Sequence, residues 1–242
     1  TTLGTGFMVN DEGYFLTAAH LVSSYPETIE KIEQANQRDQ LANEIRAEGL
    51  PKAEQQKRLR ALGKTSGDDP TQVSLSIWPT GGKSQQVDSF VIDNYGDIAL
   101  GKIANYEQGM VGAFPKFAQL NGDELPCGKS LCTLGHAFHS FVTEWDEGSL
   151  SFNIPPGAFP VPRFPMNSIL TRGIKVVVED KEKGTMHERS FIELSSPGLK
   201  GQSGGPVFDV NGTVFGLQSQ TTSHELGFNT KEKQYFHVGV AA

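Results

Sequence analysis

From about residue 70 to its end, the chain is a series of short β-rich segments separated by turn residues, and this pattern limits the folds open to it. Segments such as 73–78, 98–103 and 213–218 are bounded by Gly, Pro, Asn or Asp. We expect further strands at 87–92, 131–134, 174–179, 191–194, 206–209 and 235–240. Many short strands at even spacing are typical of a β-sandwich or β-barrel. The 27 Gly and 13 Pro fit that class better than a helical bundle.

The N-terminal part combines a hairpin with a stretch of helical character. Residues 6–9 and 14–17 read as strands joined by a turn at 10–13. Between about residues 26 and 63 the chain is rich in Glu, Gln, Lys, Arg and Ala, with Ile and Leu near helical spacing. A break at 49–51 divides this stretch, so we expect two helices inserted into a β domain. A solvated helical hairpin is favoured over a regulatory or oligomer-forming loop.

Charge and composition exclude several classes of protein. The 21 basic and 28 acidic residues give a net charge of −7, whereas a nucleic-acid-binding protein needs a clustered basic face. No apolar run approaches the roughly 18 residues that span a bilayer. Cys127 and Cys132 are expected to be free thiols, and no set of residues has the spacing of a metal site. We therefore expect no nucleic acid, no membrane segment, no metal and no cofactor.

Three local patterns carry candidate chemistry. His20 ends a β-rich run that starts at Leu16, and Asp97 stands at the mouth of an apolar strand. Ser203 lies in the glycine-rich turn Gly201-Gln202-Ser203-Gly204-Gly205-Pro206, just before a strand.

These residue types are the ones that amide hydrolysis needs. Serine is a weak nucleophile unless an imidazole takes its proton, and histidine suits this role because its pKa lies near neutrality. A carboxylate such as Asp97 fixes the tautomer of that imidazole. The flanking glycines allow a tight turn that aims two backbone N–H groups, those of Gly201 and Ser203, at an oxyanion.

The order His20, Asp97, Ser203 separates this chain from other hydrolase classes. Subtilisins and α/β-hydrolases use different orders, and Ser203 is followed by a strand rather than by the helix of a nucleophile elbow. With residues 4–9 and 216–219 added to the three motifs, the chain resembles the chymotrypsin-fold (trypsin-like) serine proteases. Within them it is most similar to bacterial HtrA-like and related trypsin-like peptidases. The resemblance covers most of the chain except about residues 24–70 and 143–172.

This resemblance implies a fold and a division of the chain. The fold would be all-β, with two antiparallel six-stranded β-barrels and the helical insertion in the N-terminal barrel. Residues 1–242 would form one peptidase domain, with residues 1–115 in the N-terminal barrel and residues 116–242 in the C-terminal barrel. The substrate would be a polypeptide, and Ser219, Gln220 and Thr221 would pair with its backbone as an added strand.

Activation and specificity differ from the trypsin pattern. Trypsin-type zymogens have an aspartate just before the serine, where this chain has Gln202, so activation through that salt bridge is excluded. Five prolines between residues 153 and 165 predict a long irregular loop, which is the leading candidate for a switch. Six residues before the serine the chain has Pro197 and no carboxylate, so we do not expect cleavage after Lys or Arg. His237 is expected on the strand that borders the specificity pocket, where it favours acidic or polar side chains or simply has a backbone partner.

The sequence therefore predicts a serine endopeptidase, with two alternatives left open. One is a catalytically silent protease-fold binding module and the other is a general esterase. The insertion offers surface for an oligomer. An HtrA-like protein would be periplasmic or secreted, and a cytoplasmic location is also open. Because the chain starts at Thr1 and ends in a strand-like run at Ala242, we expect a processed form or a piece of a longer product.

Overall fold

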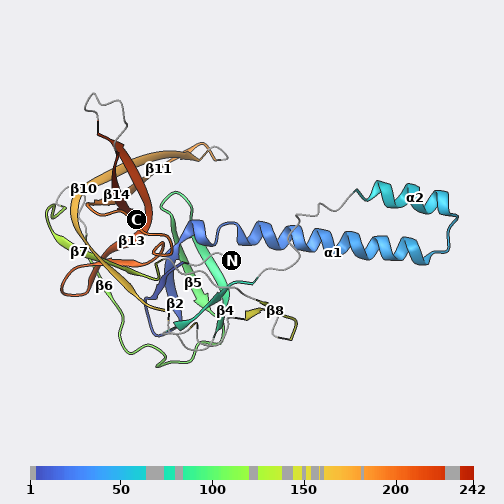
Figure 1. Cartoon of the computed structure of the whole chain (residues 1–242), viewed down its shortest axis with the longest axis horizontal. Coiled ribbons are helices and arrows are strands. Elements are labelled where there is room, and N and C mark those ends of the chain that lie inside the picture. The colour runs from blue at the N-terminus through green and yellow to red at the C-terminus, as the bar shows by residue number, and fades with distance from the viewer. Residues whose placement is uncertain are drawn as a thin grey trace.

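The chain folds into two β-sheet bodies and a helical arm (Figure 1). The computed structural model describes residues 4–63, 74–79, 84–119, 125–137, 144–148, 151–153, 158, 161–180, 183–226 and 235–242. Strands β1 to β5 form the first sheet and β6, β7 and β10 to β14 the second, and β8 and β9 pair separately.

The first sheet has the strand order β1-β2-β5-β4-β3. Its strands are β1 (Gly6–Met8), β2 (Tyr14–Ala18), β3 (Ser76–Ile77), β4 (Gln85–Asp93) and β5 (Ile98–Ile103). The expected hairpin is confirmed, because β1 and β2 pair antiparallel and Asn10 Oδ1 accepts hydrogen bonds from the backbone N–H groups of Glu12 and Tyr14. Alternation of partly buried and fully buried residues along β5 directs Ile103 into a core with Met8 and Phe15.

The second sheet closes on itself. Six strands run in the order β12-β7-β10-β11-β14-β13, and β13 pairs again with β12. The members of this sheet are β6 (Lys116–Phe117), β7 (Ser130–Gly135), β10 (Phe164–Asp180), β11 (Thr185–Leu194), β12 (Pro206–Phe208), β13 (Thr213–Glu225) and β14 (Tyr235–Ala241). The short strand β6 adds to β13 in parallel. The core of this second sheet contains Leu131, Leu170, Ile192, Leu194, Val207 and Ala241.

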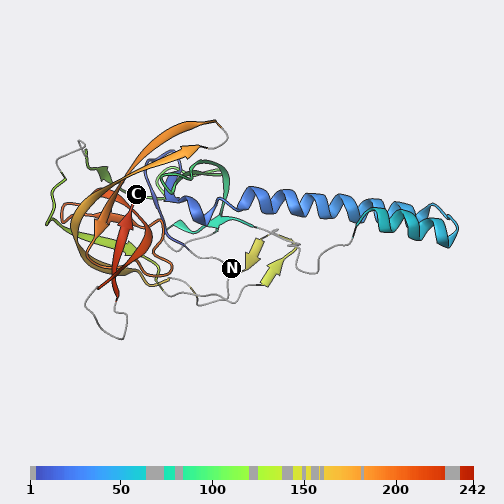
Figure 2. The same cartoon turned by 90° about the horizontal axis from the view of Figure 1, so that it is seen from above.

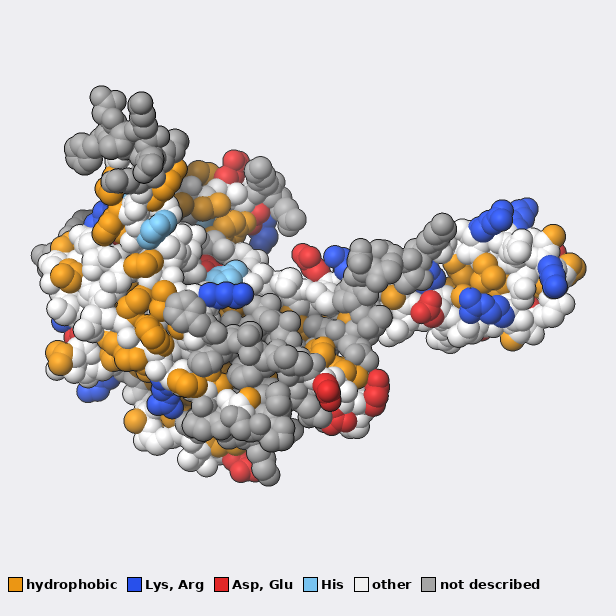
Figure 3. Space-filling view, in the orientation of Figure 1, with side chains coloured by type: hydrophobic (Ala, Val, Ile, Leu, Met, Phe, Trp, Pro, Cys, Tyr) orange, Lys and Arg blue, Asp and Glu red, His pale blue; other side chains and the backbone are white. Residues whose placement is uncertain are grey.

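The insertion is a pair of helices that projects from the sheets in both views (Figures 1 and 2). Helix α1 (Tyr25–Ala47) is followed by α2 (Lys52–Ala61), and neither contains a buried residue. The break falls where the sequence predicts it, since Gly49 has φ +67° and Pro51 precedes α2. We call this pair the arm. Lys and Arg side chains gather over α2, at the end of the arm away from the sheets (Figure 3).

Among the helices in the described ranges, none combines the length and the apolar character that crossing a bilayer requires.

The prediction of an irregular loop between residues 153 and 165 is wrong at the C-terminal end of that range. Strand β10 begins at Phe164, so Pro165 lies within a strand and pairs with Leu134 of β7. Proline is tolerated there because β11 joins the other edge of β10 only from Leu170 onward, so no second ladder needs a donor at Pro165. Residues 154–157 and 159–160 of this loop, and the linker at 64–70, lie outside the described residues.

The all-β double-barrel class with a helical insertion is confirmed. The first sheet has five strands in the described part of the chain, and the second has a closed ring of six. Two strand pairs were not expected from the sequence, namely β8 (Glu144–Asp146) with β9 (Ser151–Asn153), and the parallel contact of β6. Strands β1 to β5 lie within residues 6–103 and the others within 116–241, while the division at 115/116 stays a prediction.

Candidate active site

Strand register in the first sheet brings His20 and Asp97 together although 77 residues separate them. Ala18 at the end of β2 pairs with Ile98 at the start of β5, so the residues that follow and precede them meet at one edge. His20 lies in a single 3₁₀ turn, Ala19–Leu21, directly after β2. Its Nδ1 is 2.9 Å from Asp97 Oδ2 and 3.1 Å from Oδ1, and its backbone N–H donates to Oδ1 at 2.9 Å.

Asp97 has the left-handed backbone conformation, with φ +53°. Aspartate adopts this conformation more readily than most residues, because its short polar side chain bonds locally. The carboxylate is 19% exposed and the imidazole 46%, so solvent reaches the outer side of the ring. The Asp97 carbonyl also accepts a hydrogen bond from Ala19 N–H at 3.1 Å. The 3₁₀ turn that carries His20 is therefore held by both the backbone and the side chain of Asp97.

The pair shifts the pKa of each partner. The hydrogen bond to the Asp97 carboxylate raises the pKa of His20 above its ordinary value, although partial burial acts in the opposite direction. For Asp97, burial acts to raise the pKa, but hydrogen bonds from His20 and Ser219 outweigh it and hold the pKa below its usual range. Near neutral pH the aspartate is therefore charged and His20 is a strengthened base.

Ser219 binds Asp97 from the second sheet. Its hydroxyl donates to Asp97 Oδ2 at 2.5 Å, and the residue is only 6% exposed. The preceding residue, Gln218, accepts a hydrogen bond at its carbonyl from Gly204 N–H at 2.7 Å. Strand β13 thus connects the carboxylate directly to the turn that carries Ser203. The sequence led us to expect only a substrate-binding role for Ser219, so this side-chain contact is new.

Residues 199–205 form a tight turn, which we call the Ser203 turn. Gly201 and Gly204 have φ +95° and +81°, values that side chains rarely adopt. A Cβ at Gly204 would lie 2.2 Å from the carbonyl oxygen of Thr5, so glycine is required for close packing as well. Gln202 is fully buried; its Oε1 accepts from Leu199 N–H, and its Nε2 donates to the carbonyl of Phe164. The residue that replaces the zymogen aspartate therefore anchors this turn internally.

The backbone N–H groups of Gly201 and Ser203 have no acceptor among the described residues. Within the described ranges, neither Gly201 N–H nor Ser203 N–H donates a hydrogen bond, whereas those of Gln202, Gly204 and Gly205 all do. Ser203 itself is partly exposed. Its hydroxyl has no hydrogen bond to His20 in the described part of the structure. The turn is instead linked to the His20–Asp97 pair by β13, through the bonds of Gln218 to Gly204 and of Ser219 to Asp97.

The residues expected to determine specificity lie beside this turn. Pro197 is half-buried in the segment that leads into it, and Gln220 and Thr221 are exposed on β13. His237 is exposed on β14, where it pairs with Ser223 and its Nδ1 is 2.8 Å from the Ser223 hydroxyl. Its partner is thus a side chain rather than the expected backbone group.

Two residues that sequence reasoning missed face the Pro197 segment. Gly239 pairs with Thr221, and a Cβ there would lie 2.6 Å from the Ser196 carbonyl oxygen. The amide of Gln218 fills the neighbouring space, because a Cβ at Gly198 would lie 2.3 Å from Gln218 Nε2. A glycine inside a strand often marks such close approach, so Gly239 could have been found from the sequence. Gln218 carries no comparable signal.

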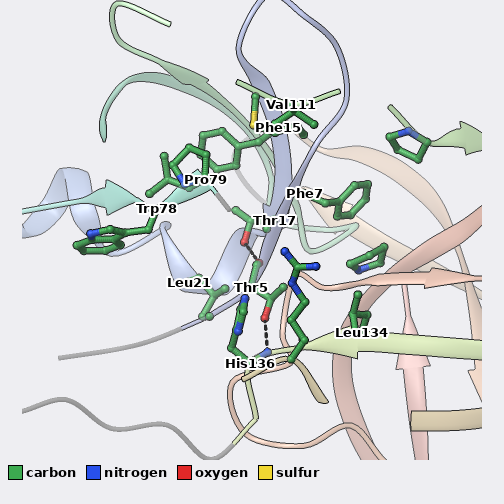
Figure 4. Close-up of a pocket in the computed structure, with 18 of the residues that line it drawn as sticks. Thr5, Phe7, Phe15, Thr17, Leu21, Trp78, Pro79, Val111, Leu134 and His136 are labelled. Carbon is green, nitrogen blue, oxygen red and sulfur yellow. Dashed lines mark hydrogen bonds between the residues drawn. The ribbon is translucent and has the colours of Figure 1, made fainter. Parts of the chain in front are cut away.

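An apolar cavity of about 870 Å³ is not lined by His20, Asp97 or Ser203. Thr5, Thr17, Leu21 and His136 are among its lining residues (Figure 4). Its polar groups bond to one another: Thr17 Oγ1 donates to the Thr5 carbonyl at 2.8 Å, and His136 N–H donates to Thr5 Oγ1 at 3.0 Å. The cavity thus borders the Ser203 turn through Thr5 without being lined by the candidate catalytic residues.

Fold and site together define a chymotrypsin-like double β-barrel with a histidine–aspartate pair at the junction of its sheets. Comparison with known families assigns it further. The sequence profile of the trypsin-like peptidase domain matches residues 4–217, and the chain therefore belongs to the trypsin-like peptidase family. No curated protein matches the chain.

The chain is similar to solved structures of proteases. The active form of the Rv3671c protease from M. tuberculosis superposes with a TM-score of 0.50 and 14% identity, over 98% of this chain and 67% of that one. The HtrA-type protease AlgW with a decapeptide gives a TM-score of 0.48 and 14% identity, over 99% of this chain and 47% of that one. The chain thus spans about two thirds of the first relative and about half of the second. At 14% identity, the likeness to the Rv3671c protease concerns the fold alone.

Proposed function

We propose that the protein is a serine endopeptidase that hydrolyses peptide bonds through His20, Asp97 and Ser203. The observation that carries this proposal is the hydrogen bond between His20 Nδ1 and the Asp97 carboxylate, at 2.9 Å. A carboxylate that accepts from Nδ1–H leaves Nε2 unprotonated, and Nε2 is then the base. Membership of the trypsin-like peptidase family agrees with this chemistry.

Acylation begins when Nε2 of His20 removes the proton of the Ser203 hydroxyl. The oxygen attacks the scissile carbonyl, and a tetrahedral intermediate forms. Asp97 remains ionised and stabilises the imidazolium that results. The Ser203 hydroxyl makes no hydrogen bond to His20 among the described residues; catalytic hydrogen bonds often tighten only when substrate binds.

The oxyanion of this intermediate would bind the N–H groups of Gly201 and Ser203. Both lack an acceptor within the described ranges, whereas the neighbouring N–H groups of Gln202, Gly204 and Gly205 all donate hydrogen bonds. Donors that are fixed before the reaction stabilise the developing charge at no cost of reorganisation. His20 then protonates the leaving amine, and water repeats the sequence on the acyl-enzyme to release the acid.

The peptide backbone of the substrate would add to β13 at Ser219, Gln220 and Thr221. One edge of this segment pairs with β14, while its other edge has no strand partner in the described part of the chain. An extended peptide bonds readily to such an edge. The Ser219 hydroxyl is committed to Asp97, so only its backbone is available to the substrate.

The side chain that precedes the scissile bond is expected to be small or uncharged. Pro197 supplies no carboxylate for Lys or Arg, and the Gln218 amide fills the space between Gly198 and Gly239. His237 is bonded to Ser223, two residue pairs away from Thr221–Gly239, so we place it at the margin of this pocket.

Digestion of a peptide library tests the proposal. The wild-type protein should cleave internal peptide bonds, and Ser203→Ala should cleave none under the same conditions. A folded wild-type protein that binds peptides without cleaving them would favour the binding-module alternative. Rapid hydrolysis of simple esters with no peptide cleavage would favour the esterase.

A further inference from the structure

Thr5 binds the Ser203 turn through both its backbone and its side chain. It precedes β1 and is 7% exposed. Its N–H donates to the Ser203 carbonyl at 2.8 Å, and its hydroxyl donates to the Gly201 carbonyl at 2.7 Å. The hydroxyl also accepts from His136 N–H, so its one donor and one of its acceptor sites are used. Figure 4 shows Thr5 between Thr17 and His136.

These two bonds fix one peptide group before the serine and one directly after it. The Gly201–Gln202 peptide is held at its carbonyl by the Thr5 hydroxyl and at its N–H by the Leu199 carbonyl, at 2.9 Å. The Ser203–Gly204 peptide is held at its carbonyl by Thr5 N–H and at its N–H by the Gln218 carbonyl. Thr5 therefore supplies one of the two restraints on each of these peptide planes.

Free and hydrogen-bonded N–H groups alternate from Gly201 to Gly204 in the described structure, and this order shows what the two bonds from Thr5 achieve. The N–H groups of Gly201 and Ser203, which have no acceptor among the described residues, belong to the peptides that flank the Gly201–Gln202 peptide. The middle peptide shares the Cα atoms of Gly201 and Gln202 with those two peptides. A rotation of the middle peptide that is not compensated at both Cα atoms therefore turns one or both of the free N–H groups. At Gly201 rotation is especially easy, since glycine lacks the steric restriction of a side chain.

We propose that Thr5 is a positioning residue that keeps the oxyanion-binding N–H groups of the Ser203 turn aligned. This inference rests on the proposed serine-protease function and adds a residue to it. Thr5 touches no reacting atom. Its hydroxyl acts through the Gly201 carbonyl, so its removal should weaken binding of the transition state more than binding of the substrate.

The first test compares Thr5→Val with Thr133→Val in the full chain. Thr133 is 1% exposed, and its hydroxyl has no partner among the described residues, so the same substitution there removes no hydrogen bond. We expect Thr5→Val to lower kcat on the order of 10- to 100-fold and to change KM by no more than about twofold. Affinity for a peptide boronate, which forms a tetrahedral adduct, should fall in parallel with kcat. Thr133→Val should retain wild-type kcat.

A second pair of variants keeps the test decisive if Thr5→Val does not fold. Thr5→Ser and Thr5→Cys both lack the γ-methyl group and differ in the strength of the donor, because a thiol donates weakly. We expect serine to restore kcat to near the wild-type value and cysteine to lower it at unchanged KM. Equal kcat for the two variants, or a Thr5→Val enzyme as active as wild type, would overturn the inference. An inactive wild-type protein would instead refute the proposed function itself.

Discussion

Replacing Asp97 by Asn removes the charge of the carboxylate with little change of shape. The backbone should tolerate it, because asparagine adopts the left-handed conformation of this position (φ +53°) at least as readily as aspartate. The two oxygens accept four hydrogen bonds: Oδ1 from the N–H and Nδ1 of His20, and Oδ2 from Nδ1 and from Ser219. An amide can accept at only one of these two atoms.

The consequence for catalysis follows from the hydrogen bonds that are lost. With its oxygen on His20 N–H, the amide turns its NH₂ group toward Nδ1, which must then accept. The proton moves to Nε2, and His20 can no longer act as a base. In a chymotrypsin-type protease the same substitution of the triad aspartate lowers kcat about 10⁴-fold. At 1.36 kcal/mol for each factor of ten, that is about 5.4 kcal/mol of transition-state stabilisation.

The pH profile separates this effect from a loss of folding. In the wild type, kcat/KM should fall as pH decreases through the raised pKa of His20, because the protonated ring cannot accept the serine proton. In Asp97→Asn the pKa of His20 should return toward its ordinary value, so the acid limb of the residual activity moves to lower pH. Imidazole NMR titration measures the same shift directly.

Asp93 offers a matched control four residues earlier. Asp93 pairs with Arg189 at 2.7 Å and accepts from the N–H groups of Tyr95 and Gly96, without contact to His20. Asp93→Asn should therefore lower stability and leave kcat near the wild-type value. If Asp97→Asn retained kcat within tenfold of the wild type, or if Asp93→Asn lost as much as Asp97→Asn, the assigned role of Asp97 would be refuted.

Three further outcomes are expected. Gly204→Ala should lower the free energy of unfolding by about 2–4 kcal/mol in urea titrations, because strain at φ +81° adds to a clash with the Thr5 carbonyl; Gly212→Ala, at φ +76° with open space, should cost less. Lys129 and Arg172 hold the pKa values of Asp209 and Glu193, respectively, below their usual range. The two carboxylates therefore stabilise the fold above about pH 4, and this stabilisation is lost as pH falls further. A melting temperature independent of pH between about 5 and 2 would contradict this. Replacing residues 26–63 by a short linker should leave kcat/KM within about threefold, since no residue of the arm is buried, and a larger loss would assign the arm a role in catalysis.

Local patterns were enough to predict much of the fold. Strand β5 lies where its alternating residues place it, at 98–103, and the break between α1 and α2 falls at the predicted glycine and proline. These features depend on interactions within a few residues. The start of β10 was missed because Pro165 suppresses strand propensity, and only the partner strand β7 shows that its edge is available.

In the candidate site, too, local features could be predicted and contacts between distant residues could not. His20, Asp97 and Ser203 could be singled out because each occupies a recognisable local motif and their order is informative. The contribution of Thr5 could not be predicted, because its hydroxyl bonds to a carbonyl 196 residues away. Likewise, the side chain of Ser219 reaches Asp97 across 122 residues. Such contacts arise from the packing of one sheet against the other, which no local pattern encodes.

Covalent labelling by a peptidyl phosphonate tests the central claim most directly. If an imidazole paired with Asp97 activates the Ser203 hydroxyl, mass spectrometry of the digested protein will find a single adduct, and it will be on Ser203. Labelling of His20→Ala should be at least about 10³-fold slower, and that of Ser203→Ala absent. An unlabelled wild-type protein, or an adduct on any other residue, would contradict the account.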